Sequence, residues 1–189
     1  MATHNVLLSI ASPRFPKAYL EIIAIDPDAA ASPRARWFDL DDAAVRDCIA
    51  VAPTLLHWVA RIRNGAADDD IDAALVSLRA AGHDPGDVAD SERATATGEM
   101  LRWRITLPRD GRRPAGGAVP LLIEWGEGHP TESLPASGVE IESLRIGGVD
   151  ERAAATLGTA PDGVDAPVLA VTLRGPLGIV VLAAPRLAR

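Results

Sequence analysis

Three chemically capable side chains lie within short, otherwise apolar segments of this 189-residue chain. Glu21 is the only charged residue of Tyr-Leu-Glu-Ile-Ile, Glu124 is that of Leu-Leu-Ile-Glu-Trp, and His57 begins the segment His-Trp-Val. A carboxylate inside an apolar strand is costly unless a metal ion, a cation or a hydrogen-bond donor receives it. We therefore expect Glu21, His57 and Glu124 to line a small pocket.

Each of these side chains also has an interpretation without pocket chemistry. Glu21 is merely exposed if its face of the strand is the solvent side of a half-buried sheet. Glu124 shares a face with Leu122, whereas Ile123 and Trp125 point to the other face. On its own face Glu124 can form a cross-strand ion pair with Arg102 or Arg104. His57 can be a hydrogen-bonded core histidine. The residues alone leave these alternatives open.

Composition and charge restrict the class of protein. The chain is 48% hydrophobic and 24% charged, which is ordinary for a globular protein. A net charge of −7 argues against binding to nucleic acid. Cys48 is the single cysteine, so the chain has no disulfide framework. No apolar run reaches about 18 residues and no secretory leader is visible, so we expect no membrane association and a cytoplasmic location.

Local patterns predict a strand-rich chain with three helices. The clearest helix is 68–81, where Ile71, Leu75 and Leu78 lie at positions i, i+4 and i+7 and Gly82 follows the end. The stretch 86–97 is polar and receives no firm assignment. The other predicted helices span 41–49 and 150–157, and the predicted strands span 5–11, 19–25, 57–62, 100–107, 119–125, 139–146, 168–173 and 178–182.

This order of elements suggests a repeated β-α-β-β-β plan, and a family resemblance accompanies it. The runs Thr-His-Asn-Val-Leu-Leu at 3–8 and Tyr-Leu-Glu-Ile-Ile at 19–23 resemble the first module of glyoxalase-like domains. These domains belong to the vicinal-oxygen-chelate (glyoxalase/bleomycin resistance/dioxygenase) superfamily. Four later segments resemble the second module, in the expected order: 70–74, 101–104, 120–125 and 129–130.

The resemblance implies an α+β fold of paired βαβββ modules, with mixed sheets curled around a cup-shaped cavity. Residues 1–50 are then a partial first module with a linker, 51–130 the second module, and 131–189 a β-α-β-β unit that completes the fold. The strand and helix that begin a first module are missing. The C-terminal unit 139–157 can replace them, with Glu142 facing the site, or a partner chain can supply them, or the site needs no metal.

The resemblance also implies a chemistry. Glu21, His57 and Glu124 become ligands of Zn, Ni, Mn or Fe, and Glu124 or Glu21 doubles as the base in a lyase, isomerase or ring-cleaving dioxygenase reaction on a small oxygenated substrate. The alternatives are a metal-free protein that binds a small molecule without catalysis, and a structural domain with a filled cup. A homodimer is expected. The expected substrate pocket consists of His4, Asn5, Arg102, Trp103, Trp125 and His129.

Overall fold

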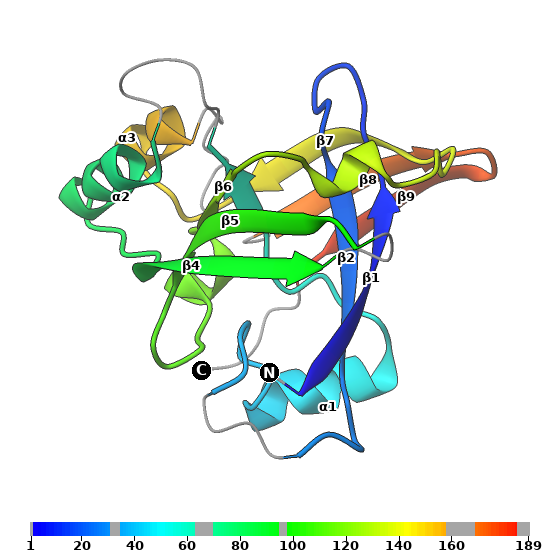
Figure 1. Cartoon of the computed structure of the whole chain (residues 1–189), viewed down its shortest axis with the longest axis horizontal. Helices are drawn as coiled ribbons and strands as arrows, with labels where there is room; N and C mark the ends of the chain where they lie inside the picture. The colour runs from blue at the N-terminus through cyan, green and yellow to red at the C-terminus, as the bar shows by residue number, and fades with distance from the viewer. Residues whose placement is uncertain (1, 31–34, 63–69, 95–97, 158–168, 185–189) are drawn as a thin grey trace.

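The computed structural model describes residues 2–30, 35–62, 70–94, 98–157 and 169–184. These ranges hold both helices and strands, and the predicted α+β class is confirmed (Figure 1). No helix among them is long and apolar enough to cross a membrane. The elements are β1 (Thr3–Ser9), β2 (Tyr19–Ile25), α1 (Ala43–Val51), β3 (Val59–Arg61), α2 (Ile71–Ala80), β4 (Asp87–Ala94), β5 (Met100–Leu107), η1 (Pro114–Gly117), β6 (Leu121–Trp125), η2 (Pro130–Glu132), β7 (Glu140–Ile146), α3 (Glu151–Thr156), β8 (Leu169–Gly175) and β9 (Gly178–Ala183).

One complete βαβββ unit forms the centre of the molecule. It runs from β3 through α2 to β4, β5 and β6, and its sheet has the strand order β3-β6-β5-β4. The first and last strands of the unit, β3 and β6, are parallel, whereas the other pairs are antiparallel. This is the element order that the sequence predicts for residues 51–130.

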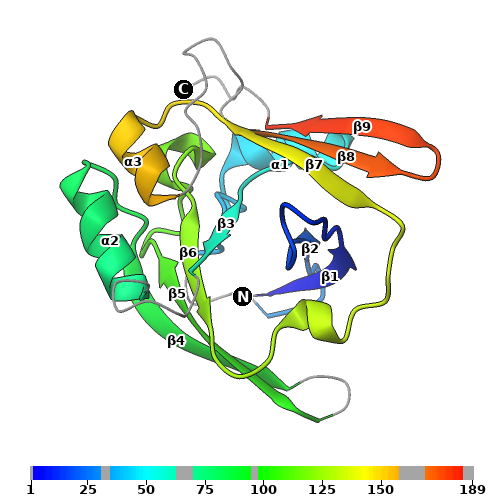
Figure 2. The ribbon, with the colours of Figure 1, turned by 90° about the horizontal axis from the view of Figure 1, so that it is seen from above.

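Helices α2 and α3 cover one face of the central sheet, and Figure 2 shows them on the side away from the β1–β2 hairpin. Leu75 and Leu78 of α2 pack with Leu122 of β6 and with Ala153 and Ala154 of α3 in one buried cluster. Helix α2 begins at Asp70, whose side chain accepts a hydrogen bond from the backbone N–H of Ala73 at 2.7 Å. Its apolar spacing therefore produces the packing that the sequence predicts.

The β1–β2 hairpin packs on the third sheet, whose strand order is β7-β8-β9. Ile10 forms a buried cluster with Ile141, Val171 and Leu173, and the N–H of Ile141 donates to the carbonyl oxygen of Ile10 at 2.9 Å. Beyond this contact just after β1, no ladder of hydrogen bonds joins the three sheets, so no closed barrel forms among the described residues. The hairpin thus lies between the C-terminal sheet and the central sheet (Figure 2).

The C-terminal β-α unit expected at 139–157 is present as β7 and α3. Strand β7 pairs antiparallel with β8, and α3 packs beside α2. Glu142 of β7 pairs with Arg174 of β8. The three sheets fall within the segments 1–50, 51–130 and 131–189, although the division into separate domains stays a prediction.

Strand β4 lies in the polar stretch 86–97, to which the sequence gives no firm element. All eight of its residues pair with β5, from Asp87 opposite Leu107 to Ala94 opposite Met100. The strand is an edge, and charged side chains such as Glu92 pair across to β5. Ion pairs on an exposed edge replace the apolar alternation that identifies a half-buried strand.

Candidate functional site

The register of β5 and β6 assigns each predicted site residue of these strands to a face. Trp103 pairs with Trp125 and Arg104 pairs with Glu124. Directly opposite residues in an antiparallel pair point to the same face. The two tryptophans therefore share a face with Ile123, which we call the inner face, and Glu124 lies on the opposite face, which α2 covers.

Glu124 is held by an ion pair on the α2 side of the sheet. Its carboxylate is 3.2 Å from Nη1 of Arg104, and Nη2 of Arg104 lies 2.6 Å from Asp72 at the start of α2. The hydrogen bonds to these two carboxylates raise the pKa of Arg104 above its ordinary value, the contribution of Asp72 being the largest. The structure thus places Glu124 in the cross-strand ion pair that was the alternative to a ligand role.

Glu21 lies on the exposed part of the hairpin, where its side chain accepts a hydrogen bond from Nδ2 of Asn5. Tyr19, two residues earlier, shares its face of β2. Burial, followed by the negative charge of Glu21, raises the pKa of Tyr19 to about 12. His4 neighbours Asn5 on the strand and is exposed, so its side chain points to the other face of the hairpin. The hairpin therefore presents Tyr19, Glu21 and Asn5 together but not His4.

His57 lies just before β3, with its ring 5.4 Å from that of Phe38. Both ring nitrogens are buried and have no hydrogen-bond partner in the described part of the chain. Burial, and then the positive charge of Arg113, lower the pKa of His57 to about 3. Arg113 is itself 2.8 Å from Asp39 and donates to the carbonyl oxygen of Leu56 at 3.0 Å. The charge that acts on His57 is thus a guanidinium rather than a carboxylate.

These environments do not fit the divalent metal that the fold family implies. Glu124 faces Arg104, Glu21 accepts from Asn5, and His57 lies beside a cation. Within the described ranges, no group of three or more His, Cys, Asp or Glu side chains is arranged to hold a metal ion. The structure therefore does not bring the predicted ligand set together.

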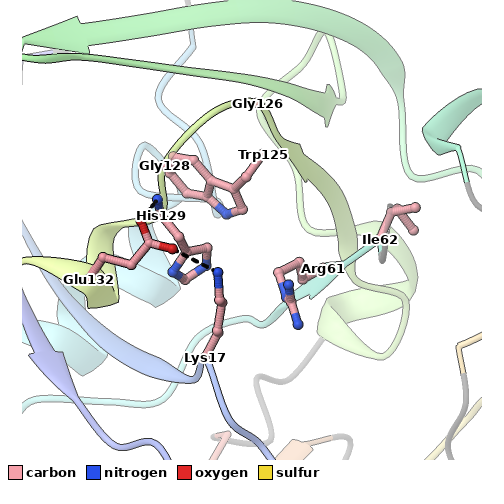
Figure 3. Close-up of a pocket in the computed structure, with 8 residues that line it drawn as sticks. All are labelled: Lys17, Arg61, Ile62, Trp125, Gly126, Gly128, His129 and Glu132. Carbon is pink, nitrogen blue, oxygen red and sulfur yellow. Dashed lines mark hydrogen bonds and ion pairs between the residues drawn. The ribbon is translucent and has the colours of Figure 1, made fainter. Parts of the chain in front are cut away.

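A cavity of about 200 Å³ lies instead on the inner-face side, where β3 and β6 end (Figure 3). It is bounded by the turn between β1 and β2, by the loop after β6 and by η2. Figure 3 shows the side chains of Lys17 and His129 close together beside the Trp125 ring, with Arg61 across the space from them. Its lining residues are Lys17, Arg61, Ile62, Trp125, Gly126, Gly128, His129 and Glu132.

A row of aromatic rings leads into this cavity. The ring of Trp125 lies 5.2 Å from that of Trp103 and 5.2 Å from that of His129, and His129 lies 5.9 Å from Tyr19. Three residues of the predicted substrate pocket, Trp103, Trp125 and His129, are therefore neighbours. Arg102 is not among them, because it points to the opposite face and pairs with Glu92 at 3.2 Å.

His129 is a neutral hydrogen-bond donor in this cavity. The residue is 4% exposed, and burial, followed by the charges of Lys17 and Arg61, lowers its pKa to about 4. Its Nδ1 accepts from the backbone N–H of Thr131 at 3.3 Å and lies 2.8 Å from Oγ1 of the same residue. An imidazole that accepts at Nδ1 carries its proton on Nε2 when neutral. The ring thus offers one N–H to a bound molecule.

Lys17 and Arg61 line this site, although neither belongs to the substrate pocket that the sequence predicts. Lys17 pairs with Glu132 at 2.9 Å, whereas Arg61 has no carboxylate within ion-pair distance in the part of the chain that the structure describes. The sequence does hold a signal for Arg61, since the spacing of two residues places it on the same face as Val59 of β3 and as His57 before the strand. Lys17 is the chain's single lysine, but nothing in its turn predicts that it meets η2.

A wider hollow of about 570 Å³ lies over β4, β5 and β6. Its charged lining residues include Glu92, Arg102, Arg104 and Glu124, and these already pair with one another. The smaller cavity differs because one of its cations has no such partner among the described residues. It is therefore the better candidate for a binding site.

The comparisons with known proteins agree with this architecture. The family model described as a glyoxalase-like domain matches residues 1–161, so the chain belongs to the glyoxalase-like domain family. The predicted resemblance is thereby confirmed. No curated protein and no solved structure gives a significant match.

Proposed function

We propose that this glyoxalase-like protein binds a small oxygenated molecule in the cavity beside Trp125, and that binding needs no resident metal. The observation that carries the proposal is that Arg61, Lys17 and His129 line one cavity together with the ring of Trp125. Ligand sites combine an apolar wall with a few convergent polar groups. The cavity has both parts.

The chemistry of the lining supports binding rather than metal-assisted turnover. The Trp125 ring supplies a flat apolar wall, and the cationic and N–H donors supply hydrogen bonds to oxygen atoms. The carboxylates expected to act as ligand or base are engaged elsewhere, Glu124 with Arg104 and Glu21 with Asn5. We therefore favour the metal-free binding protein over the metal-dependent lyase, isomerase or dioxygenase.

Saturation-transfer NMR on chelator-treated protein tests this function. The probes are benzamide and benzoate, which share a ring of the size of one side chain and differ in charge. Saturable binding of at least one probe is expected, with loss in Trp125→Leu and retention in Trp37→Leu, a tryptophan outside the cavity. Absence of binding by both probes at millimolar concentration would overturn the proposal and favour a structural domain.

A further inference from the structure

The cavity carries more positive than negative charge in a chain whose net charge is −7. Among the described residues, two cations, Lys17 and Arg61, line it together with one carboxylate, Glu132. We propose that the molecule it binds is a small organic monocarboxylate, held by Arg61 and Lys17 with its apolar part against Trp125. This inference rests on the proposed function and names the class of ligand.

Arg61 is aimed at the cavity by the parallel pairing of β3 with β6. It lies opposite Ile123, an inner-face residue, and the following N–H of Ile62 donates to the carbonyl oxygen of Ile123 at 2.8 Å. Its guanidinium has no carboxylate partner in the described ranges, in contrast to Arg104 and Arg113. A guanidinium forms two parallel hydrogen bonds with a carboxylate, which gives the site geometric preference for that group.

Lys17 supplies a second cation and can keep its ion pair with Glu132 while it binds a ligand. Its ammonium uses one N–H toward Glu132 at 2.9 Å, and two N–H donors remain. Glu132 is fixed independently, because its other carboxylate oxygen accepts the backbone N–H of His129 at 3.1 Å. Glu132 therefore stays in the cavity wall as an anion. Two cations beside one fixed anion match a single negative charge.

The size of the cavity limits what accompanies that charge. About 200 Å³ is less than the roughly 300–1,000 Å³ of pockets for drug-sized ligands. A single ring or a short chain against Trp125 fits this space, with the Nε2 proton of His129 as one further donor. Nucleotides and other polyphosphates are larger and carry several negative charges, which this lining does not match.

The test compares benzoate, its neutral analogue benzamide, and inorganic phosphate on the full-length chain by NMR titration. Benzoate is expected to bind at least about tenfold more tightly than benzamide, because the neutral amide lacks the hydrogen-bonded charge pair with Arg61. Arg61→Gln should lower benzoate affinity by about tenfold or more. Arg109→Gln removes the same charge from a side chain that is 92% exposed and pairs with Asp87, and it should leave affinity unchanged.

The outcomes separate this inference from the proposed function. Equal affinity for benzoate and benzamide, or equal effects of Arg61→Gln and Arg109→Gln, would overturn the carboxylate and leave small-molecule binding standing. Phosphate is the third outcome. If phosphate displaces benzoate at a concentration lower than that at which benzoate binds, the carboxylate proposal is overturned and the cavity is a phosphate site. Failure of both ring compounds to bind would overturn the carboxylate and the proposed function together.

Discussion

His129 illustrates how one residue depends on both local and distant groups. The residues after it fix its tautomer, since Thr131 donates to its Nδ1 and Glu132 accepts its backbone N–H. Burial, and then the charges of Lys17 from the hairpin and Arg61 from β3, disfavour a positive charge on the ring and lower its pKa. The imidazole therefore stays neutral at pH 7 as a donor rather than as a cation.

The lowered pKa of His129 predicts a pH dependence of stability. In the unfolded chain the imidazole binds a proton below about pH 6.5, whereas in the folded protein it does so only near pH 4. Between these values the unfolded state binds more protons, so stability falls as the pH is lowered. Urea unfolding at pH 7 and pH 4.5 should show a loss about 2 kcal/mol smaller in His129→Gln than in the wild type. Equal losses would contradict the lowered pKa.

For single residues, the sequence predicts the strand face of a side chain better than it predicts the residues that the side chain contacts. Strand alternation correctly separates Glu124 from Trp125. Which of these faces meets helices and which meets the cavity depends on α2 packing over Leu122, a contact between distant segments. The same limit applies to Arg61, whose neighbours come from the hairpin and η2. Spacing along one strand does not contain that information.

At the scale of elements, the segment before α1 is held against the loop that follows β5. The N–H of Asp39 donates to the carbonyl oxygen of Gly111 at 3.1 Å, and Phe38 and Asp39 both adopt positive φ angles, of 65° and 58°. Phe38 packs on the inner face near His57. The contact between Asp39 and Gly111 therefore fixes the segment that holds Phe38 against the ring of His57.

Gly111 and Gly116 form a matched pair for testing that contact. Their φ angles are +70° and +67°, but a Cβ on Gly111 would lie 2.2 Å from the carbonyl oxygen of Arg36, whereas a Cβ on Gly116 meets nothing within 4 Å. Gly116→Ala should cost about 1 kcal/mol of unfolding free energy, from backbone conformation alone. Gly111→Ala should cost clearly more, by about 2 kcal/mol or above. Thermal and urea unfolding measure both, and similar costs would contradict the close contact.

The predicted elements match best where apolar alternation is strong. Strands β2 and β5 have the bounds that their sequences predict, 19–25 and 100–107, and α2 lies within 68–81. Strand β4 was not assigned because its pairing with β5 depends on charged side chains at an edge. Edge strands derive their position from the neighbouring strand more than from their own pattern.

At the scale of the whole molecule, the edge strands β4 and β9 differ in chemistry. The β4 edge carries charged residues, which discourage pairing with another strand. In β9 the apolar side chains of Ile179, Val180 and Val181 are 53%, 54% and 63% exposed, and the strand pairs only with β8 among the described residues. An apolar free edge favours antiparallel pairing with the same strand of a second copy.

The homodimer expected from the sequence therefore stays a prediction with a definite test. Light scattering should give twice the chain mass for the wild type and the single-chain mass for Val181→Lys, since a charge on the edge blocks pairing. Val76→Lys places the same charge on an equally exposed valine of α2, 68% exposed, and should remain dimeric. A monomeric wild type, or a dimeric Val181→Lys, would contradict pairing through β9.

Metal-free binding in the cavity beside Trp125 is what separates the proposed function from a metal-dependent enzyme. The most direct measurement is the dissociation constant of benzoate for protein treated with chelator and for the same protein resupplied with Zn, Ni, Mn or Fe. Metal-free binding requires the same dissociation constant in every sample. Binding that is absent after chelation and restored by one metal would contradict it and return Glu21, His57 and Glu124 to consideration as ligands.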